Sequence, residues 1–478
     1  MRAHVTTLSF TILFSGIAHA DTLNVPLDYP TIQSAIDAAQ VGDVVLVAPG
    51  NYVEAINFLG KNITVVSAKG PVVTGIKPPL GRGTPTVTFA AKESPTAVLS
   101  GFAIGGGFGG PIIDPVFGAC FAGGGIYCFE SSPEISNCRM IGNNGGGSSS
   151  VPGHGGGMVI VRGNPTVRHC EFLQNSASGH GGAIYIIGGS QATIDGCVFT
   201  NNSASWGGAI TCTMNVSAMF TDCVFTGNEV INVGGAMYIR SSSSPILDGC
   251  DFIGNIQEGN PTAGGGAVTM YGSGNGGGPC YPVFTDCEFI ENIAQGYGGA
   301  VHAAYSGNPT MIDCQFTLNT STAGGGAIAT LGHIKAPTTV EIQDSIIEFN
   351  QTDGNGAGLD ARMSTVLLSN VSIMGNDAGM SGGGCSFNSS ETSILINSTI
   401  CGNSPDQTFG VFNDNGGNTI TDRCIKCEGD LTGDGSVDSA DVGLLLADWN
   451  QDGPADLNGD SVVNSADLGL LLVKWGPC

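Results

Sequence analysis

A short phrase recurs along this chain at nearly constant spacing. Its most complete copy begins with Gly181-Gly182-Ala183-Ile184-Tyr185 and closes with Phe199-Thr200-Asn201-Asn202. Most successive copies lie 26 or 27 residues apart, which is the signature of a solenoid. The asparagines that close the copies are Asn143, Asn175, Asn202, Asn228, Asn255, Asn292, Asn319, Asn350, Asn376 and Asn403.

Each unit is predicted to be a β-coil rather than a pair of helices. Apolar residues alternate or form short runs bounded by Gly, Asn, Ser and Pro, and they show no 3.6-residue period. Stacked coils place equivalent residues about 4.8 Å apart. We therefore expect each Asn side chain to lie over the next one and to bond to it amide to amide, at a corner where Asn tolerates a tight backbone turn.

A column of cysteines accompanies the asparagines. We expect mostly reduced, buried thiols, because neighbours in one parallel column lie farther apart than a disulfide prefers. The seven members are Cys138, Cys170, Cys197, Cys223, Cys250, Cys287 and Cys314.

The paired Gly-Gly-Ala-(Ile/Val/Met) and Phe-x-x-Asn motifs resemble the repeats of chlamydial polymorphic outer-membrane proteins. Residues 22–415 as a whole resemble the right-handed parallel β-helix, pectin-lyase-like superfamily. The resemblance implies an all-β fold class, with a solenoid of about a dozen coils. It does not specify a reaction, because this fold carries lyases, hydrolases, esterases and adhesins.

The N-terminal segment divides into two parts. Residues 1–20 hold an apolar stretch followed by Ala18-His19-Ala20, which predicts a secretory signal peptide and a secreted or cell-surface protein. Residues 21–68 are predicted to form a capping helix and a first coil. Thr31 is the expected N-cap of that helix. Its apolar stripe consists of Ile32, Ala35, Ile36 and Ala39.

Residues 69–423 contain the repeats, and 424–478 form a separate small domain. The net charge of −25 argues against nucleic acid and anionic membrane surfaces as partners. It also disfavours a polyanionic polysaccharide unless calcium bridges it. No later stretch is long and apolar enough for a membrane span.

A row of ring-bearing residues precedes the Gly-Gly corners. His154, His180, Trp206 and Tyr297 occupy this position in different coils, with Val233, Gly264 and Gly324 in others. We interpret the row as the candidate carbohydrate-binding face, because ringed residues in a groove commonly hold extended glycans. The alternative is that the rings only shield the turn.

Insertions and an acidic row give further candidates. Insertions in repeat proteins fall on corners and often frame the binding face. Here they are Gly145–Pro152, Gln257–Thr262, Gly272–Cys280 and about His333–Thr338. The acidic row could collect cations or form a solvated polar face, and it comprises Asp222, Asp286, Asp313 and Asp344.

No complete catalytic motif is present, so catalytic residues stay unassigned. Gly153-His154-Gly155 and Gly179-His180-Gly181 are similar to the Gly-His-Gly of polygalacturonases. That family also needs an Asp-Asp pair, which this chain lacks, and His333-Ile334-Lys335 stands where an Arg would be needed. Paired carboxylates for glycoside hydrolysis could still come from separate coils.

Two loops near the C-terminus are predicted to bind two Ca²⁺ ions. Oxygen ligands at loop positions 1, 3, 5, 9 and 12, with a backbone carbonyl at 7, define such loops. The first set is Asp430, Thr432, Asp434, the Ser436 carbonyl, Asp438 and Asp441. The second set is Asp456, Asn458, Asp460, the Val462 carbonyl, Asn464 and Asp467. Apolar helices are expected at Val442–Trp449 and Leu468–Trp475.

The two loops, each followed by one helix, resemble a type I dockerin, an EF-hand-like module. Ser461 departs from the pattern because it replaces the turn glycine, whereas Asp at position 12 is usual in dockerins. The resemblance implies a cohesin-like protein or cell-surface component as partner. The resemblance also implies that this partner is recognised mainly at Ser439, Ala440, Ser465 and Ala466. We also expect Cys478 to bond to Cys424 or Cys427, since the ends of such a module meet.

Two functions remain open. In the favoured one, a secreted calcium-binding modular protein presents a carbohydrate- or surface-binding β-helix and docks through its C-terminal module. In the alternative, the β-helix is a polysaccharide lyase or O-glycosyl hydrolase that the dockerin recruits to a complex. The dockerin favours an enzyme, whereas the missing catalytic motifs disfavour one.

Overall fold

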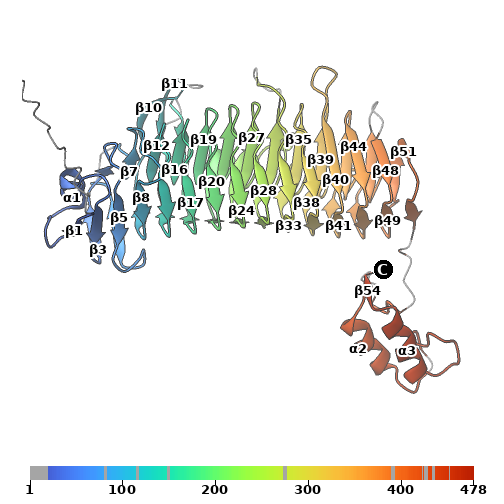
Figure 1. Ribbon diagram of the computed structural model, residues 1–478. Coiled ribbons are helices and arrows are strands. Elements are labelled where there is room, and N and C mark those ends of the chain that lie inside the picture. Colours follow the sequence, from blue (N-terminus) through green and yellow to red (C-terminus); the bar gives the residue numbers. More distant parts are fainter. Residues whose placement is uncertain are drawn as a thin grey trace, which may run out of the picture.

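The computed structural model describes residues 20–79, 83–114, 118–147, 151–272, 277–388, 393–422, 424, 429–432, 436–451 and 453–477. A long stack of parallel strands is followed by a small helical module (Figure 1). The predicted all-β solenoid is thereby confirmed.

Three parallel sheets run the length of the stack, and each coil adds one strand to each. Sheet A contains β1 (Thr22–Val25), β2 (Val44–Val47), β5 (Thr64–Ser67), β8 (Val98–Ser100), β13 (Glu134–Ser136), β17 (Thr166–Arg168), β20 (Thr193–Asp195), β24 (Met219–Thr221), β28 (Ile246–Asp248), β32 (Val283–Thr285), β36 (Thr310–Ile312), β40 (Thr339–Gln343), β44 (Thr365–Ser369), β48 (Ser393–Ile396) and β51 (Phe412–Asp414). Sheet B contains β3 (Gly50–Val53), β6 (Thr74–Lys77), β9 (Ala103–Gly105), β14 (Arg139–Ile141), β18 (Glu171–Leu173), β21 (Val198–Thr200), β25 (Val224–Thr226), β29 (Asp251–Ile253), β33 (Glu288–Ile290), β37 (Gln315–Thr317), β41 (Ile346–Glu348), β45 (Ser372–Met374), β49 (Thr399–Cys401) and β52 (Thr419–Thr421). Sheet C contains β4 (Ile56–Asn57), β7 (Val87–Phe89), β12 (Ile126–Phe129), β16 (Met158–Val161), β19 (Ile184–Ile187), β23 (Ile210–Thr213), β27 (Met237–Arg240), β31 (Val268–Tyr271), β35 (Val301–Ala304), β39 (Ile328–Leu331), β43 (Leu359–Arg362), β47 (Cys385–Asn388) and β50 (Thr408–Gly410).

Shorter sheets fill the corner between sheets B and C. Sheet D contains β22 (Ser203–Trp206), β26 (Glu229–Val233), β30 (Ile256–Gln257), β34 (Ile293–Ala294), β38 (Thr320–Ser321), β42 (Gln351–Thr352) and β46 (Asp377–Ala378). A three-stranded sheet near the N-terminal end contains β10 (Gly110–Asp114), β11 (Gly118–Ala122) and β15 (Gly153–His154). Sheet A has 15 strands in the described residues, so the stack is longer than a dozen coils because the predicted cap segment supplies β1, β2 and β5.

Buried asparagine side chains connect consecutive coils, as predicted. The Asn202 Nδ2 group donates to Asn228 Oδ1 at 3.0 Å, and Asn228 Nδ2 donates to Asn255 Oδ1 at 2.9 Å. The same pattern continues to Asn403, whose amide donates to Gln407 Oε1 at 2.9 Å. Because every member is buried, the ladder satisfies polar groups that no water could reach.

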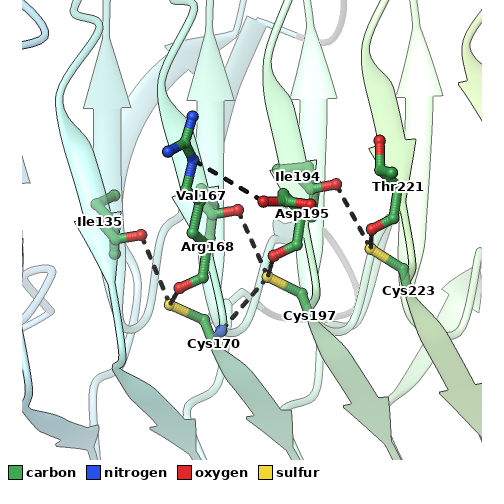
Figure 2. Close-up of polar contacts among 9 residues, drawn as sticks. All are labelled: Ile135, Val167, Arg168, Cys170, Ile194, Asp195, Cys197, Thr221 and Cys223. Carbon is green, nitrogen blue, oxygen red and sulfur yellow. Dashed lines mark hydrogen bonds and ion pairs between the residues drawn. The ribbon is translucent and has the colours of Figure 1, made fainter.

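Phenylalanine rings and thiols form two further internal columns. Consecutive rings from Phe199 to Phe316 stack with centroids 4.7–4.8 Å apart. The seven predicted cysteines are free and buried. Figure 2 shows that Cys170, Cys197 and Cys223 each direct the sulfur at a backbone carbonyl of the preceding coil. The expectation of reduced thiols is therefore met.

The Gly-Gly corner is explained by two different requirements. Gly181 has φ +62°, a left-handed conformation that L-residues with side chains adopt at a cost. Gly182 lies so close to the next coil that an added Cβ would come within 2.3 Å of the Gly208 carbonyl oxygen. One glycine therefore permits the turn, and the other permits the close approach of coils.

Helix α1 (Ile32–Ala38) covers the first coil as predicted. Thr31 caps it, and its buried residues are Ile32, Ala35 and Ile36. The Glu54 carboxylate accepts from the amides of Ile32 and Gln33, at the positive end of the helix. Lys61 Nζ donates to the carbonyls at the other end. These contacts tie the cap to the coils below it.

The C-terminal module consists of α2 (Ser439–Ala447), α3 (Ser465–Val473) and the short pair β53 (Ser436–Val437) and β54 (Gly476–Pro477). Each helix begins three residues before the predicted start, because Asp438 and Asn464 act as N-caps in capping boxes. Its buried apolar core is small and comprises Val437, Leu445, Ala455, Val463 and Leu471.

One disulfide expectation is corrected. Cys424 bonds to Cys401, with the Cα atoms 4.8 Å apart, and not to Cys478. The reason is that Cys424 follows the last strand of sheet B, which pairs with the strand that ends at Cys401. The other partner that we considered, Cys427, and Cys478 itself lie outside the described residues.

Candidate functional site

The predicted ring row stacks, but most of it is buried. The ring centroids of His154 and His180 lie 5.3 Å apart, and those of His180 and Trp206 lie 5.0 Å apart with planes at 22°. His154 is 1% exposed because the fully buried Tyr185 ring packs against it, whereas Trp206 is 37% exposed. Of these three rings only Trp206 reaches the surface, so the expectation that His154 and His180 lie on an exposed face is wrong.

The histidines are held neutral. Burial lowers the pKa of His154 to about 4, and burial is also the largest cause that lowers the pKa of His180, with smaller electrostatic contributions from His154 and Arg240. The His180 amide donates to His154 Nδ1 at 3.0 Å, and this hydrogen bond orients the His154 ring. The two imidazoles thus form an uncharged, rigid base for the Trp206 indole.

Tyr297 lies in the same row but in a different environment. The guanidinium carbon of Arg362 lies 4.4 Å from the Tyr297 ring centroid, and Arg362 Nε donates to Asp360 Oδ2 at 2.7 Å. Burial raises the pKa of Asp360 to about 6, although the arginine opposes this shift. An added Cβ on Gly324 would lie 2.5 Å from Asp360 Oδ2, so this glycine leaves the room that the ion pair occupies.

Two carboxylates from neighbouring coils also meet in sheet D. Glu229 begins β26 and is paired with Ile256 of β30, and Glu258 follows that strand. Burial, and then the charge of Glu258 and a hydrogen bond to it, raise the pKa of Glu229. Glu229 also pairs with Ser203 of β22, the strand that ends at Trp206. The two acids and the exposed indole therefore belong to one small sheet.

Sequence reasoning left both the Asp360–Arg362 ion pair and the Glu229–Glu258 pair unassigned, and the first of these carried a usable signal. Among the described residues, Asp360 is the only charged one in its column on the outer side of sheet C, where neighbouring coils carry His302, Ala329 and Ser386. An isolated charge in a buried column is a detectable departure. Glu229 and Glu258 carry no such mark, because their proximity depends on the sheet D register.

The acidic row is explained by backbone geometry. Asp222, Asp286, Asp313 and Asp344 are exposed and have φ between 49° and 53° at the corner from sheet A to sheet B. Asn or Gly takes the same position in other coils, as at Asn370 and Gly249. Asp, Asn and Gly are the residues that best tolerate this left-handed conformation. The conformation of the turn therefore explains why these positions are acidic, and the row lies on a solvated face.

Two of the predicted insertions frame a cleft. Residues 277–280 of the Gly272–Cys280 insertion and the whole of His333–Thr338 lie at the corner from sheet C to sheet A, on either side of the shorter corner after β35, whereas residues 273–276 lie outside the described residues. The cleft between them has a volume of about 650 Å³. The Gln257–Thr262 insertion lies at the sheet D corner instead, as does Gly145–Pro152, of which residues 148–150 lie outside the described residues.

Residues of the second predicted calcium loop lie close together. Asn458 Nδ2 lies 3.0 Å from Asp460 Oδ2, and Asn464 Nδ2 lies 2.7 Å from the Val462 carbonyl oxygen. Asp467 is buried, and its carboxylate accepts from the amides of Leu457, Asn458 and Asn464. Ser461 takes the turn glycine position with φ 70°, so the loop keeps its turn at some backbone cost.

The first loop is organised in the same way. The Asp441 carboxylate accepts from the amides of Leu431, Thr432 and Asp438, and Thr432 Oγ1 lies 3.2 Å from Asp430 Oδ1. Asp434 lies outside the described residues. Over the described parts of the chain, no three His, Cys, Asp or Glu side chains gather closely enough to hold a metal by themselves. A cation would thus also need the amide, hydroxyl and carbonyl oxygens of these loops.

The predicted partner residues occupy equivalent places on the two helices. Ser439 and Ala440 form the exposed first turn of α2, and Ser465 and Ala466 form that of α3. The module therefore presents two similar surfaces, one per helix start.

No helix in the described residues is long and apolar enough to cross a membrane.

Comparison with known proteins agrees with this fold. The family model described as "Right handed beta helix region" matches residues 99–204 and 161–335, just under half of the chain. The solenoid is a right-handed parallel β-helix. No curated protein matches this chain.

Several solved structures share the architecture at low identity. The catalytic unit of a GH87 alpha-1,3-glucanase from Streptomyces thermodiastaticus is 14% identical, with a TM-score of 0.43, over 82% of this chain and 65% of its own. A mannuronic acid specific polysaccharide family 6 lyase from human gut microbiota is 11% identical, with a TM-score of 0.40, over 83% and 92%. The catalytic domain of a GH87 alpha-1,3-glucanase in complex with nigerose is 13% identical, with a TM-score of 0.45, over 84% and 69%. This chain thus spans less than two thirds of the first of these proteins, and likenesses at this level carry no argument about chemistry.

Proposed function

We propose that the protein is a secreted β-helix that engages an extracellular polysaccharide and is anchored to a partner through a calcium-loaded C-terminal module. The observation that carries the carbohydrate assignment is Trp206. Its indole is on the surface, and it is stacked on His180, which is stacked on His154. An aromatic ring that is already fixed loses little conformational entropy when a sugar ring packs on it.

The charge balance defines the kind of polysaccharide. The net charge is −25, and the basic Arg362 is already paired with Asp360. A polyanionic chain would be repelled at long range. We therefore expect a neutral or weakly charged polysaccharide.

Retention on insoluble neutral polysaccharides tests the proposal. Trp206→Ala should reduce binding by about tenfold or more, because truncating a central aromatic contact commonly costs at least 1–2 kcal/mol. Phe349→Ala is the matched control, since Phe349 is an exposed ring at another corner. Equal retention of the Trp206→Ala variant and wild type would show that this row does not bind the polymer.

Hydrolysis of the polysaccharide is a second candidate, and one observation favours it. Glu229 and Glu258 come from separate coils, and burial together with Glu258 raises the pKa of Glu229, which is the direction of shift that suits a general acid. Paired carboxylates of this kind serve glycoside hydrolysis as acid and as base or nucleophile. Release of reducing ends by wild type, but not by Glu229→Gln or Glu258→Gln, would support an enzyme. Equal rates for all three would remove this pair from consideration.

Calcium is proposed for both loops of the module. The ligand types fit, since the second loop offers three aspartates, two asparagines and a backbone carbonyl, and Ca²⁺ takes six to eight oxygen ligands. Asp441 and Asp467 would hold each loop against its helix, and Asp438 and Asn464 would contribute oxygens while capping it. Titration calorimetry should give two ions per chain.

A cohesin-like protein or cell-surface component is the proposed docking partner. Support comes from the two equivalent exposed helix starts at Ser439-Ala440 and Ser465-Ala466. Replacing the small residues of one start with arginine should leave binding intact, because the other start remains. Replacing both should abolish it. Failure of wild type to bind any cohesin in a calcium-containing buffer would reject this partner.

Export follows from the predicted signal peptide. Cleavage after Ala20 would leave Asp21 as the first residue. The Asp21 nitrogen lies 2.9 Å from Asp43 Oδ1, so the new ammonium group would face a carboxylate. Mass determination of the secreted protein checks the cleavage position.

A further inference from the structure

We infer that the cleft at the corner from sheet C to sheet A is a second carbohydrate site, which takes a short neutral oligosaccharide unit. Three consecutive corners form it. The corner after β35 (residues 305–309) is short and makes the floor, while residues 277–281 of the longer corner after β31 and residues 332–338 after β39 stand on either side. The cleft exists because a short corner lies between two long ones.

Hydrogen bonds fix the floor to both walls. The Cys280 amide donates to the Ser306 carbonyl, and the Asn308 amide donates to the Cys280 carbonyl at 2.8 Å. On the other side, the Thr339 amide donates to Asn308 Oδ1 at 2.8 Å and the Ser306 amide to Thr338 Oγ1 at 3.2 Å. The site is thus preorganised, which lowers the entropic cost of binding.

The second wall has its own rigidity. His333 and Ala336 exchange two backbone hydrogen bonds, of 3.1 and 2.8 Å, and so form a tight turn. The Lys335 amide donates to His333 Nδ1 at 3.1 Å within this turn. Lys335 is therefore held at the rim, where its ammonium group can reach a ligand.

The lining combines apolar faces with hydroxyl-binding groups. Tyr281 is 59% exposed and lines the cleft together with the rings of Pro279, Pro309 and Pro337. Such faces suit the C–H side of a pyranose ring. Asn308, Thr310, Thr339 and Glu341 provide polar groups among them. Sugars have the same alternation of apolar ring faces and equatorial hydroxyls.

The charge of the lining and the volume of the cleft restrict the class of ligand further. Lys335 and Glu341 are the charged residues of the lining and cancel each other, although the chain as a whole is strongly acidic. A volume of about 650 Å³ lies within the range of about 300–1,000 Å³ that is usual for small-ligand sites. The cleft therefore fits a short neutral oligosaccharide, such as a branch or chain end. The inference rests on the proposed function for the class of ligand.

The cleft and Trp206 lie at opposite edges of sheet C. Trp206 ends β22 of sheet D, just before sheet C in its coil, whereas the cleft follows sheet C. The two sites can therefore be removed separately. Trp206 would grip the polymer, and the cleft would recognise a branch or end.

The test uses the full chain and short neutral gluco-, xylo- and manno-oligosaccharides, with affinity measured by calorimetry. Tyr281→Ala removes the exposed ring and Thr339→Trp fills the cleft from a strand position that accepts an aromatic residue. Both variants should bind the best oligosaccharide at least about tenfold more weakly. Phe349→Ala should bind it as wild type does.

The outcomes separate this inference from the proposed function. If the polymer is retained through Trp206 but no oligosaccharide binds, or if Tyr281→Ala and Thr339→Trp bind like wild type, the cleft is not a carbohydrate site. If a proline-rich peptide binds the cleft and no oligosaccharide displaces it, the ligand class is wrong. If neither polymer nor oligosaccharide binds wild type, the proposed function fails together with the inference.

Discussion

In the solenoid, buried polar groups bond to one another from coil to coil within a continuous apolar core, whereas the C-terminal module holds three buried aspartates beside a core of five residues. Asn228 has partners above and below it, as does every inner member of its column. Asp441 and Asp467 instead collect backbone amides with carboxylates that keep their charge. In the solenoid the repeat satisfies neutral polar groups, whereas in the module a cation would balance the charge that the amides leave in place.

The difference shows how each region resists unfolding. Residues 428–478 contain ten acidic residues and Lys474 as the one basic residue. Close like charges repel by about 1–4 kcal/mol per pair, depending on the local dielectric. So small a core does not offset this repulsion. The solenoid should thus fold without a ligand, and the module should need Ca²⁺.

Removal of calcium should have the largest effect and should act on one region only. Chelation should unfold the module, because metal binding and folding are coupled in such loops. The transition of the solenoid should stay in place. Calorimetric scans of the full chain with and without chelator would show this as the loss of one of two transitions.

The matched control for chelation is a variant without the buried carboxylates. Asp441→Asn with Asp467→Asn should lack the calcium-dependent transition at any calcium concentration. An unchanged scan after chelation of wild type would contradict the coupling of metal and fold. Loss of both transitions would show that the regions are not independent.

Breaking the asparagine ladder should give the next largest effect, in the solenoid. Asn228→Ala leaves the buried backbone amide of Asn202 without an acceptor. It also removes the three hydrogen bonds that join the Asn228 side chain to Asn202, Phe199 and Asn255, although Asn202 Nδ2 still donates to Phe172 and Asn255 Oδ1 still accepts from the Asn228 amide. At about 1–3 kcal/mol for the unsatisfied amide and about 0.5–1.5 kcal/mol for each other lost bond, we expect a loss of roughly 3–6 kcal/mol. Denaturant unfolding measures it.

Asn201 provides the control for the ladder. It is exposed, has φ 52°, and is adjacent in sequence. Asn201→Ala should cost only about 1–2 kcal/mol for the left-handed backbone. Similar losses at the two positions would mean that the ladder adds no special stability.

Lowering the pH should destabilise the solenoid through His302, with a smaller effect than the two changes above. Burial and, after it, the charge of Arg362 lower the pKa of His302 to about 4. The unfolded chain takes up this proton near pH 6.5, so the stabilisation from neutral His302 is complete above that pH and is lost as the pH falls towards 4. At pH 5 the loss should be about 2 kcal/mol.

His302→Phe should remove that part of the acid sensitivity. Burial raises the pKa of Asp360 to about 6, so this carboxyl stabilises the folded state as the pH falls from about 6 to 4, opposite to His302. Because the variant and wild type share Asp360, its contribution cancels when their unfolding free energies are compared. Unfolding curves at pH 7 and pH 5 give the comparison. A variant that is as acid-sensitive as wild type would show that His302 is not the titrating group.

The cysteine column should tolerate substitution better than the asparagine ladder or His302. Cys223 donates weakly to the carbonyls of Ile194 and Thr221, and a serine hydroxyl can do the same. The chain already places Ser345 in this column, where it accepts from the Cys314 amide. Cys223→Ser should therefore change stability by less than about 1 kcal/mol. Cys223→Leu, which overfills the column, should cost about 1–3 kcal/mol.

The comparison of regions also explains what was predictable. The Asn, Cys and Phe columns follow from the period alone, because stacking in register is the only arrangement that places identical residues together. Thr31 and the apolar stripe after it identified the cap helix through local rules. The start of each C-terminal helix was placed three residues late, because Asp438 and Asn464 serve both as predicted ligands and as caps.

The candidate site was predicted less well. The row that ends in Trp206 was found from its register, but its exposure was not, because Tyr185 covers His154 from a strand of another sheet. Glu229 and Glu258 met through the pairing of sheet D strands, which carry no clear pattern in the sequence. The cleft was anticipated only as a pair of insertions.

The sequence by itself determined the coil, its period and the columns inside it, since those depend on repeated local requirements for turns and for bonding between like residues. Tertiary structure alone decided which rings reach the surface, that Arg362 lies over Tyr297, and that a short corner between two long ones leaves a cleft. These features depend on the relative positions of neighbouring coils. A one-dimensional pattern records the spacing of residues along the chain, but not which side chain covers which.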